Sequence, residues 1–198
     1  PLPLEYTKEE KEYEFECLNE KIENLKDLIN LGKKYITHYK EKKKRYNLNL
    51  RVLSDLVKPL EELDNMIGMK NIKESIFNKI ILHLQNLDNK NTDYNHVVLC
   101  GSPGMGKTHV AKILGKIYNK IGFLSKGTFK EAKLTDLKAG YLGQTEIKTQ
   151  RLLDEAKGGV LFFDEAYSLG SESKFDSYSQ SVIYVINPYL DRYKDDFI

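Results

Sequence analysis

The sequence predicts an α/β fold in which helices flank a parallel β-sheet, and three observations predict it. A short apolar run, residues 96–100, leads into the glycine-rich octapeptide GSPGMGKT of residues 101–108. Apolar side chains then recur at helical spacing over residues 110–121. A second apolar run, Val160–Glu165, closes with two adjacent carboxylates. Continuous apolar runs are typical of buried parallel strands, and ligands collect at the carboxyl ends of such strands.

The octapeptide fits the phosphate-binding pattern G-x-x-x-x-G-K-[ST] at every fixed position. Its glycines permit backbone conformations that other residues avoid, so its N–H groups can converge on phosphate oxygens at the start of a helix. Lys107 is placed to reach the β- and γ-phosphates, and the Thr108 hydroxyl is placed to ligate Mg²⁺. The predicted phosphate-binding residues are Gly101, Ser102, Pro103, Gly104, Met105, Gly106, Lys107, Thr108 and His109.

The two carboxylates after the second apolar run predict the rest of a nucleotide site. Asp164 is the expected metal partner, and Glu165 is expected to polarise the water that attacks the γ-phosphate. A strand that runs into a solvated acidic turn is the alternative, and the phosphate loop upstream favours the site. The sequence therefore predicts Mg²⁺-dependent hydrolysis of a nucleoside triphosphate, with Glu165 and Lys107 as the catalytic residues; the resemblance described next implies that the nucleotide is ATP.

These motifs resemble those of AAA+ ATPases, which are P-loop NTPases. Besides the phosphate loop, the resemblance rests on GYLGQT at residues 140–145 and DEAYSL at residues 164–169. The branch it points to contains the red-type rubisco activases and the stage V sporulation protein K-like ATPases. It covers about residues 60–198. It implies an ATP-driven remodelling motor that acts on a protein substrate as a hexameric ring.

The resemblance also implies roles for two further segments. Met66, Ile67 and Gly68 take the position that contacts the adenine base, although an ordinary apolar lead-in to the next helix also fits them. Tyr141 and Leu142 take the position of the pore loop that grips a translocating polypeptide. A tyrosine that pins a turn to the core is the alternative there.

The resemblance also predicts that the sheet is truncated at its C-terminal end. The sensor strand, the lid and the arginine finger of the family lie downstream of the matched region. The strand expected to start near residues 196–198 is a central one, between the first and third strands of the family's sheet. This puts the activity of the chain by itself in question.

Two regions are expected along the chain. Residues 1–50 form an N-terminal helical appendage, either a hairpin or a short coiled coil, and residues 51–198 form the N-terminal part of the AAA+ large subdomain. A seam of apolar residues at steps of three and four indicates helix in the appendage, and residues 30–32 are expected to interrupt it. The seam consists of Phe15, Leu18, Ile22, Leu25 and Ile29.

Besides the helix over residues 110–121, three longer helices are predicted in the second region. Residues 72–87 read as an amphipathic helix and residues 144–157 as another. Residues 179–193 look helical, with Pro188 inside. Before them, Pro59 is expected to end a short connecting helix, because proline disfavours helical geometry in the residue that precedes it.

Composition limits the partners. Lys plus Arg number 31 and Asp plus Glu 29, so the net charge of +2 does not point to nucleic acid or to a membrane surface. No apolar stretch approaches the roughly 18 residues of a membrane span. The two cysteines suggest no disulfide framework, which favours the cytoplasm or another reducing compartment, and Cys100 is expected to be buried. A nucleotide-dependent scaffold and a nucleic-acid-directed AAA+ loader remain the alternatives to a remodelling motor.

Overall fold

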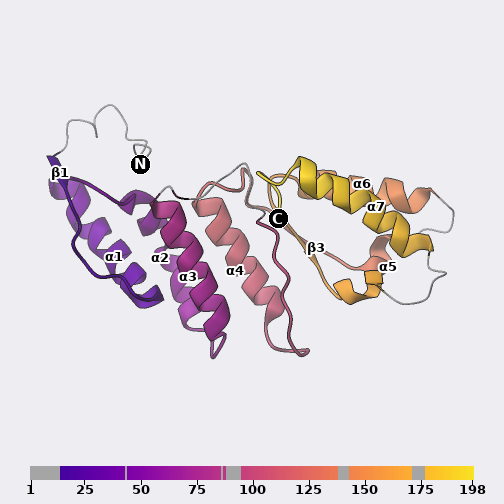
Figure 1. The fold of residues 1–198 in the computed structure, drawn as a ribbon, viewed down its shortest axis with the longest axis horizontal. Coiled ribbons are helices and arrows are strands. Elements are labelled where there is room, and N and C mark those ends of the chain that lie inside the picture. Colours follow the sequence, from indigo (N-terminus) through magenta and orange to yellow (C-terminus); the bar gives the residue numbers. More distant parts are fainter. Residues whose placement is uncertain (1–13, 43, 86, 88–94, 138–142, 171–176) are drawn as a thin grey trace. The chain divides into compact units, whose positions relative to one another are not determined.

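The computed structural model describes residues 14–42, 44–85, 87, 95–137, 143–170 and 177–198. Contacts within the chain divide it into two compact units, residues 1–93 and residues 94–198 (Figure 1). Each unit is described by itself. The boundary expected between residues 50 and 51 stays a prediction.

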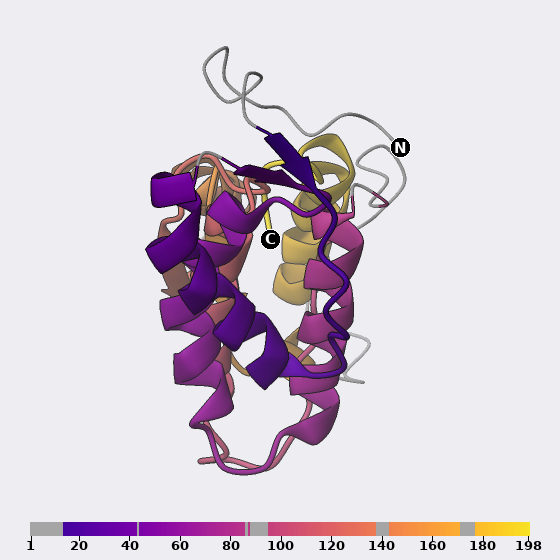
Figure 2. The same cartoon turned by 90° about the vertical axis from the view of Figure 1, so that its left-hand side faces the viewer.

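The N-terminal unit is built on helices that bury a leucine-rich face. Its elements in order are β1 (Glu14–Glu16), α1 (Leu25–Lys42), β2 (Lys44–Tyr46), α2 (Leu50–Asp64) and α3 (Lys70–Leu84). Strands β1 and β2 pair in parallel at one end of the helices (Figure 2). Helices α1 and α2 contact each other along their length. The buried apolar residues that they contribute include Leu28, Leu31, Leu53, Leu56 and Leu60.

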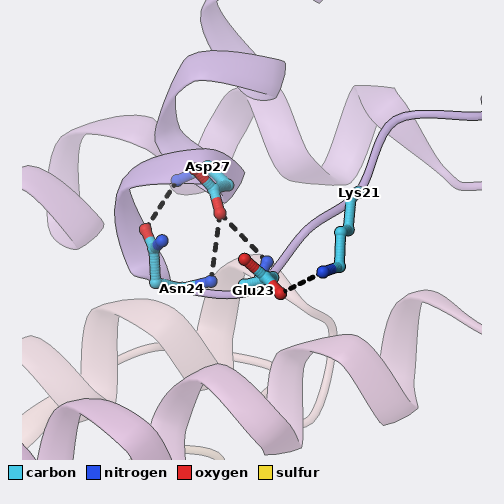
Figure 3. A network of polar contacts seen from close by, with 4 residues as sticks. All are labelled: Lys21, Glu23, Asn24 and Asp27. Atoms are coloured by element: carbon cyan, nitrogen blue, oxygen red, sulfur yellow. Dashed lines mark hydrogen bonds and ion pairs between the residues drawn. The ribbon is translucent and has the colours of Figure 1, made fainter.

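Helix α1 begins at Leu25 because a capping box precedes it (Figure 3). Asn24 Oδ1 accepts hydrogen bonds from the backbone N–H groups of Lys26 (2.9 Å) and Asp27 (3.1 Å). In return, Asp27 Oδ2 accepts from the N–H groups of Glu23 (3.0 Å) and Asn24 (3.2 Å). Backbone donors that a helix start leaves without partners are satisfied in this way.

The apolar seam over residues 15–29 predicted helix on both sides of Asn24. This prediction is only partly right. Phe15 lies in β1, where it is exposed, and residues 17–24 are not helical. Leu25 and Ile29 do lie in α1 and are buried. The spacing of apolar residues continues upstream of α1, but the capping box sets the N-terminal boundary of the helix at Asn24.

Two expected helix breaks in this unit are also wrong. Gly32 lies inside α1, where an added Cβ would stand 2.6 Å from Val57 Cγ2 and 3.0 Å from the Leu53 carbonyl oxygen. The glycine thus permits α2 to approach closely. Pro59 lies inside α2, which continues to Asp64. Buried apolar side chains on the last turns of α2 compensate for the hydrogen bond that proline removes.

The C-terminal unit combines helices with a short parallel sheet, which confirms the predicted α/β class. Its elements are α4 (Lys107–Lys120), β3 (Phe129–Ala132), α5 (Leu134–Leu137), α6 (Gln144–Ala156), β4 (Val160–Phe163), the 3-10 helix η2 (Ala166–Gly170) and α7 (Ser177–Arg192). Strands β3 and β4 pair in parallel, and the register runs from Phe129 opposite Val160 to Ala132 opposite Phe163. Among the described helices of the chain, none is long and apolar enough to cross a membrane.

A small aromatic core joins α6, α7 and the last residues of the chain. Leu153 and Ala156 of α6 are buried against Tyr189 of α7 and Phe197. The Tyr189 hydroxyl donates to the Leu153 carbonyl oxygen (3.1 Å), so its one polar atom is satisfied within the core. Pro188 lies inside α7, as its sequence position indicated.

The expected strand over residues 96–100 is not present. Val98 is 87% exposed, and Cys100 is exposed where burial was predicted. A strand needs a neighbour to satisfy its backbone groups, and β3 and β4 pair with each other. Beside β4, Leu161 N donates to the Ile198 carbonyl oxygen (2.7 Å) and Ile198 N donates to the Gly159 carbonyl oxygen (3.2 Å). In the described part of the chain, residues 96–100 pair with neither β3 nor β4.

Helix α4 lies close against β4 at a glycine. An added Cβ at Gly115 would stand 3.0 Å from Val160 Cγ2 and 3.9 Å from Phe129 Cδ2. The apolar positions that predicted this helix are buried around it: Val110, Ile113, Leu114, Ile117 and Ile121. This contact matters for the site, because α4 starts at the phosphate loop and β4 ends at the two carboxylates.

We expect Gly115→Val to lower the free energy of unfolding by about 1–3 kcal/mol, because the new methyl groups overpack this contact. Denaturant unfolding followed by circular dichroism measures the effect. Lys120→Val places the same side chain at an exposed position of the same helix. An equal decrease in the free energy of unfolding for the two variants would show that overpacking of the contact between α4 and β4 does not cause the effect.

Candidate nucleotide site

The phosphate loop has the open shape that anion binding requires. Gly104 and Gly106 have φ values of 78° and 79°, in the left-handed region that favours glycine. An added Cβ at Gly101 or Gly104 would meet nothing within 4 Å, so the loop leaves space beside its backbone. Because α4 begins at Lys107, directly after the loop, its unpaired N–H groups and the positive end of its dipole lie at this space.

Lys107 ties the first residues of the phosphate loop to the start of α4. Its Nζ donates to the carbonyl oxygens of Gly101 (2.9 Å) and Ser102 (3.0 Å). The ammonium group therefore lies across the loop and folds back on its first two residues. A phosphate at the start of α4 would offer Nζ a charged acceptor, which forms a stronger hydrogen bond than a neutral carbonyl.

Asp164 and Glu165 follow β4 directly and have well-defined geometry. Asp164 N donates to the Ala132 carbonyl oxygen (2.9 Å), which extends the β3–β4 ladder by one step. Asp164 Oδ1 accepts from the Glu165 N–H (3.0 Å). Glu165 has a φ of 56°, a left-handed conformation that costs a non-glycine residue roughly 1–2 kcal/mol. Strained residues of this kind cluster at functional sites, and the Glu165 side chain is exposed to water.

A lysine that the sequence analysis did not single out faces this carboxylate pair. Because Ala132 pairs with Phe163, the residues one step further along each strand, Lys133 and Asp164, come opposite each other. Lys133 Nζ lies 3.8 Å from Asp164 Oδ2. Lys133 N donates to Asp136 Oδ2 (2.9 Å), which anchors the backbone at this point. The parallel register is the signal that could have revealed Lys133, but a sequence alone does not specify it.

The predicted adenine contacts lie in the N-terminal unit, in the turn between α2 and α3. The Ile67 side chain is 98% exposed, and Gly68 and Met69 both have positive φ values. Lys73 Nζ donates to the carbonyl oxygens of Asp64 (2.8 Å) and Met66 (2.7 Å), which ties the turn to α3. The turn is thus held in a defined shape that presents an apolar side chain to solvent.

The remaining candidates are placed as follows. The pore-loop candidates, Tyr141 and Leu142, lie outside the described residues. Thr108 is half-buried in the first turn of α4, and His109 next to it is exposed. No hydrogen bond or ion pair joins Lys107 or Thr108 to Asp164 or Glu165 in the described part of the chain.

The donor set suits Mg²⁺. Thr108 and Asp164 offer the hard oxygen ligands that this ion prefers, and Mg²⁺ is commonly held by one or two protein oxygens together with phosphate oxygens and water. Within the described residues, no cluster of three or more histidines, cysteines or carboxylates forms a complete protein cage for a metal. Burial lowers the pKa of His96 below its ordinary value, so this imidazole adds no positive charge before the loop at neutral pH.

Comparison with known proteins agrees with this geometry. The family profile "ATPase family associated with various cellular activities (AAA)" matches residues 97–198. The putative cfxQ-like protein R730 of Acanthamoeba polyphaga mimivirus is 39% identical over 175 residues, which are 88% of this chain and 43% of that protein.

Two bacterial relatives extend the comparison. Stage V sporulation protein K of Bacillus subtilis is 37% identical over 131 residues, 61% of this chain and 40% of that protein. Protein CbbX of Cereibacter sphaeroides is 34% identical over 146 residues, 70% of this chain and 47% of that protein. These matches confirm the predicted branch, and the chain spans less than half the length of each of the three relatives.

Proposed function

Because the chain belongs to the AAA family of ATPases, we propose that it binds ATP with Mg²⁺ at the phosphate loop and hydrolyses it. The observation that carries this proposal is the loop at the start of α4, which combines left-handed glycines, open space and the ammonium group of Lys107. An assay of phosphate release from ATP, with and without Mg²⁺, tests it. A folded protein that neither binds nor hydrolyses ATP would contradict it.

Each residue has a distinct task in the proposed reaction. The loop N–H groups and Lys107 bind the phosphates and offset charge that develops on them during in-line attack by water. Asp164 and Thr108 are the proposed metal partners, and Mg²⁺ when bound supplies further charge neutralisation. Glu165 orients the attacking water and withdraws its proton, for which its exposed position at the end of β4 is suitable.

We further propose that hydrolysis drives the remodelling of a protein substrate and that the working assembly is a ring, in the form of a hexamer. The support is the resemblance to AAA+ remodelling motors and the match to relatives of that branch. The near balance of charge, +2 overall, gives no support to a nucleic-acid partner.

Two other functions make different predictions. A nucleotide-dependent scaffold would recruit a partner through the N-terminal helices, and a nucleic-acid-directed loader would respond to DNA or RNA. ATPase activity measured with an unfolded polypeptide and with single-stranded DNA separates these classes. Stimulation by the polypeptide alone supports the remodelling motor, stimulation by DNA supports the loader, and stimulation by neither supports the scaffold.

We expect Tyr141→Ala to leave ATP binding intact and to reduce the stimulation of ATPase activity by an unfolded polypeptide. A rigid aromatic side chain on a ring's inner loop holds an extended chain by apolar contact and stacking, and alanine lacks both. Tyr167→Ala is a matched control, because Tyr167 is an exposed tyrosine of η2 with no proposed role in the pore. Normal stimulation in Tyr141→Ala would assign that residue a structural role instead.

A further inference from the structure

The acidic pair at the end of β4 has a cation beside it that the proposed reaction does not use. Lys133 Nζ lies 3.8 Å from Asp164 Oδ2. The other carboxylate oxygen, Oδ1, is engaged by the Glu165 N–H at 3.0 Å. Oδ2 is therefore the oxygen of Asp164 that this backbone bond leaves untouched, and it is the oxygen that faces the lysine.

The position of Lys133 follows from the backbone on both sides. The parallel register of β3 and β4 brings residues 133 and 164 to the same edge of the sheet. The bond from Asp164 N to the Ala132 carbonyl oxygen fixes the two strand ends relative to each other. On the lysine side, the bond from Lys133 N to Asp136 Oδ2 fixes the start of α5. Both partners are thus attached to an ordered backbone, and only the side chains need to move.

From this geometry we propose that Lys133 is the counter-charge of Asp164 in the metal-free site and competes with Mg²⁺ for Oδ2. The inference rests on the proposed ATPase function, since it concerns the metal of that site. The pair is loose, because 3.8 Å exceeds hydrogen-bonding distance and the side chains of Lys133 and Asp164 are 48% and 30% exposed. Mg²⁺ arriving with a nucleotide can therefore displace the ammonium group, and Lys133 sets the Mg²⁺ concentration at which the site loads.

Titration of Mg²⁺ into the full chain saturated with metal-free ADP tests the proposal by calorimetry. We expect Lys133→Met to lower the apparent Kd for Mg²⁺ by about two- to tenfold, because one positive charge near the metal is removed in a partly screened site. Lys133→Arg keeps the charge and should behave like the wild-type protein. Lys130→Met is the matched control, because Lys130 lies on the same strand but pairs with Glu155 of α6, outside the site.

The outcomes separate this inference from the proposed function. A wild-type protein that binds neither ADP nor Mg²⁺ would contradict the ATPase proposal and this inference with it. A wild-type protein that binds both, with an unchanged or higher Kd for Mg²⁺ in Lys133→Met, would overturn the role of Lys133 alone. An equal decrease in Lys130→Met would also overturn it, because the effect would then reflect net charge and not the contact with Asp164.

Discussion

Glu165→Gln should bind ATP with wild-type affinity and hydrolyse it about 10²- to 10⁴-fold more slowly, the range typical for loss of a general base. Glutamine has nearly the same shape as glutamate but does not withdraw a proton from water. The substitution leaves the phosphate loop unchanged, because no hydrogen bond joins Glu165 to Lys107 or Thr108 in the described residues. Single-turnover hydrolysis of bound ATP measures the chemical step directly.

The control for this result is Glu131→Gln, an exposed glutamate of β3 that changes the net charge by the same amount. It should hydrolyse ATP at the wild-type rate. If Glu165→Gln also turns over at the wild-type rate while the protein remains folded, Glu165 is not the base. The left-handed backbone at Glu165 would then have no catalytic role to account for it. A glycine at this position would adopt the same backbone conformation without strain.

The parts of the site that follow from local sequence were predictable. The phosphate loop needs particular residue types at fixed spacing, and the left-handed glycines at 104 and 106 conform to that need. Helix α4 could be predicted from the sequence because its buried positions recur at helical spacing. Strand β4 was readable as a short apolar run that ends in two carboxylates. Each of these features depends on neighbours in the chain.

The parts that depend on distant residues were not predictable in the same way. Gly32 was interpreted as a helix break, but its role is set by Val57 and Leu53 of another helix. The apolar run at residues 96–100 has strand composition, yet a strand forms only where a partner is available. Lys133 became visible only when the register of β3 and β4 was known. In each case the deciding contact joins residues from different elements.

The start of α1 lies between these two cases. Asn24 and Asp27 form a capping box that can be read in the sequence as an asparagine followed three residues later by an acid. The apolar seam across residues 15–29 favoured a helix that starts further upstream, because periodicity alone does not show where a helix begins. Local capping chemistry decided the boundary here, and apolar spacing did not.

Lys107→Ala should abolish tight binding of ATP and ADP. The ammonium group is the only side-chain charge that the phosphate-loop pattern places against the β- and γ-phosphates. Its charge-assisted hydrogen bonds are worth roughly 1.5–3 kcal/mol each, so their loss weakens binding by at least about tenfold. Calorimetry with ADP in the presence of Mg²⁺ measures the change in affinity without relying on turnover.

Loss of binding in Lys107→Ala has a second possible cause, because Lys107 also ties the loop to the Gly101 and Ser102 carbonyl oxygens. Two comparisons separate the causes. Lys120→Ala removes the same charge at the exposed far end of α4 and should bind nucleotide normally. Lys107→Met keeps the aliphatic stem but removes the ammonium group, and with it both the charge and the two bonds to the loop carbonyl oxygens. It should lose binding, and an unfolding midpoint close to that of the wild-type protein would show that the loop bonds contribute little to the fold, so that the loss reflects the missing contact with phosphate. Unchanged affinity for ADP in both Lys107 variants would end the assignment of residues 101–108 as the phosphate site, because a phosphate loop without its lysine does not bind a nucleotide tightly.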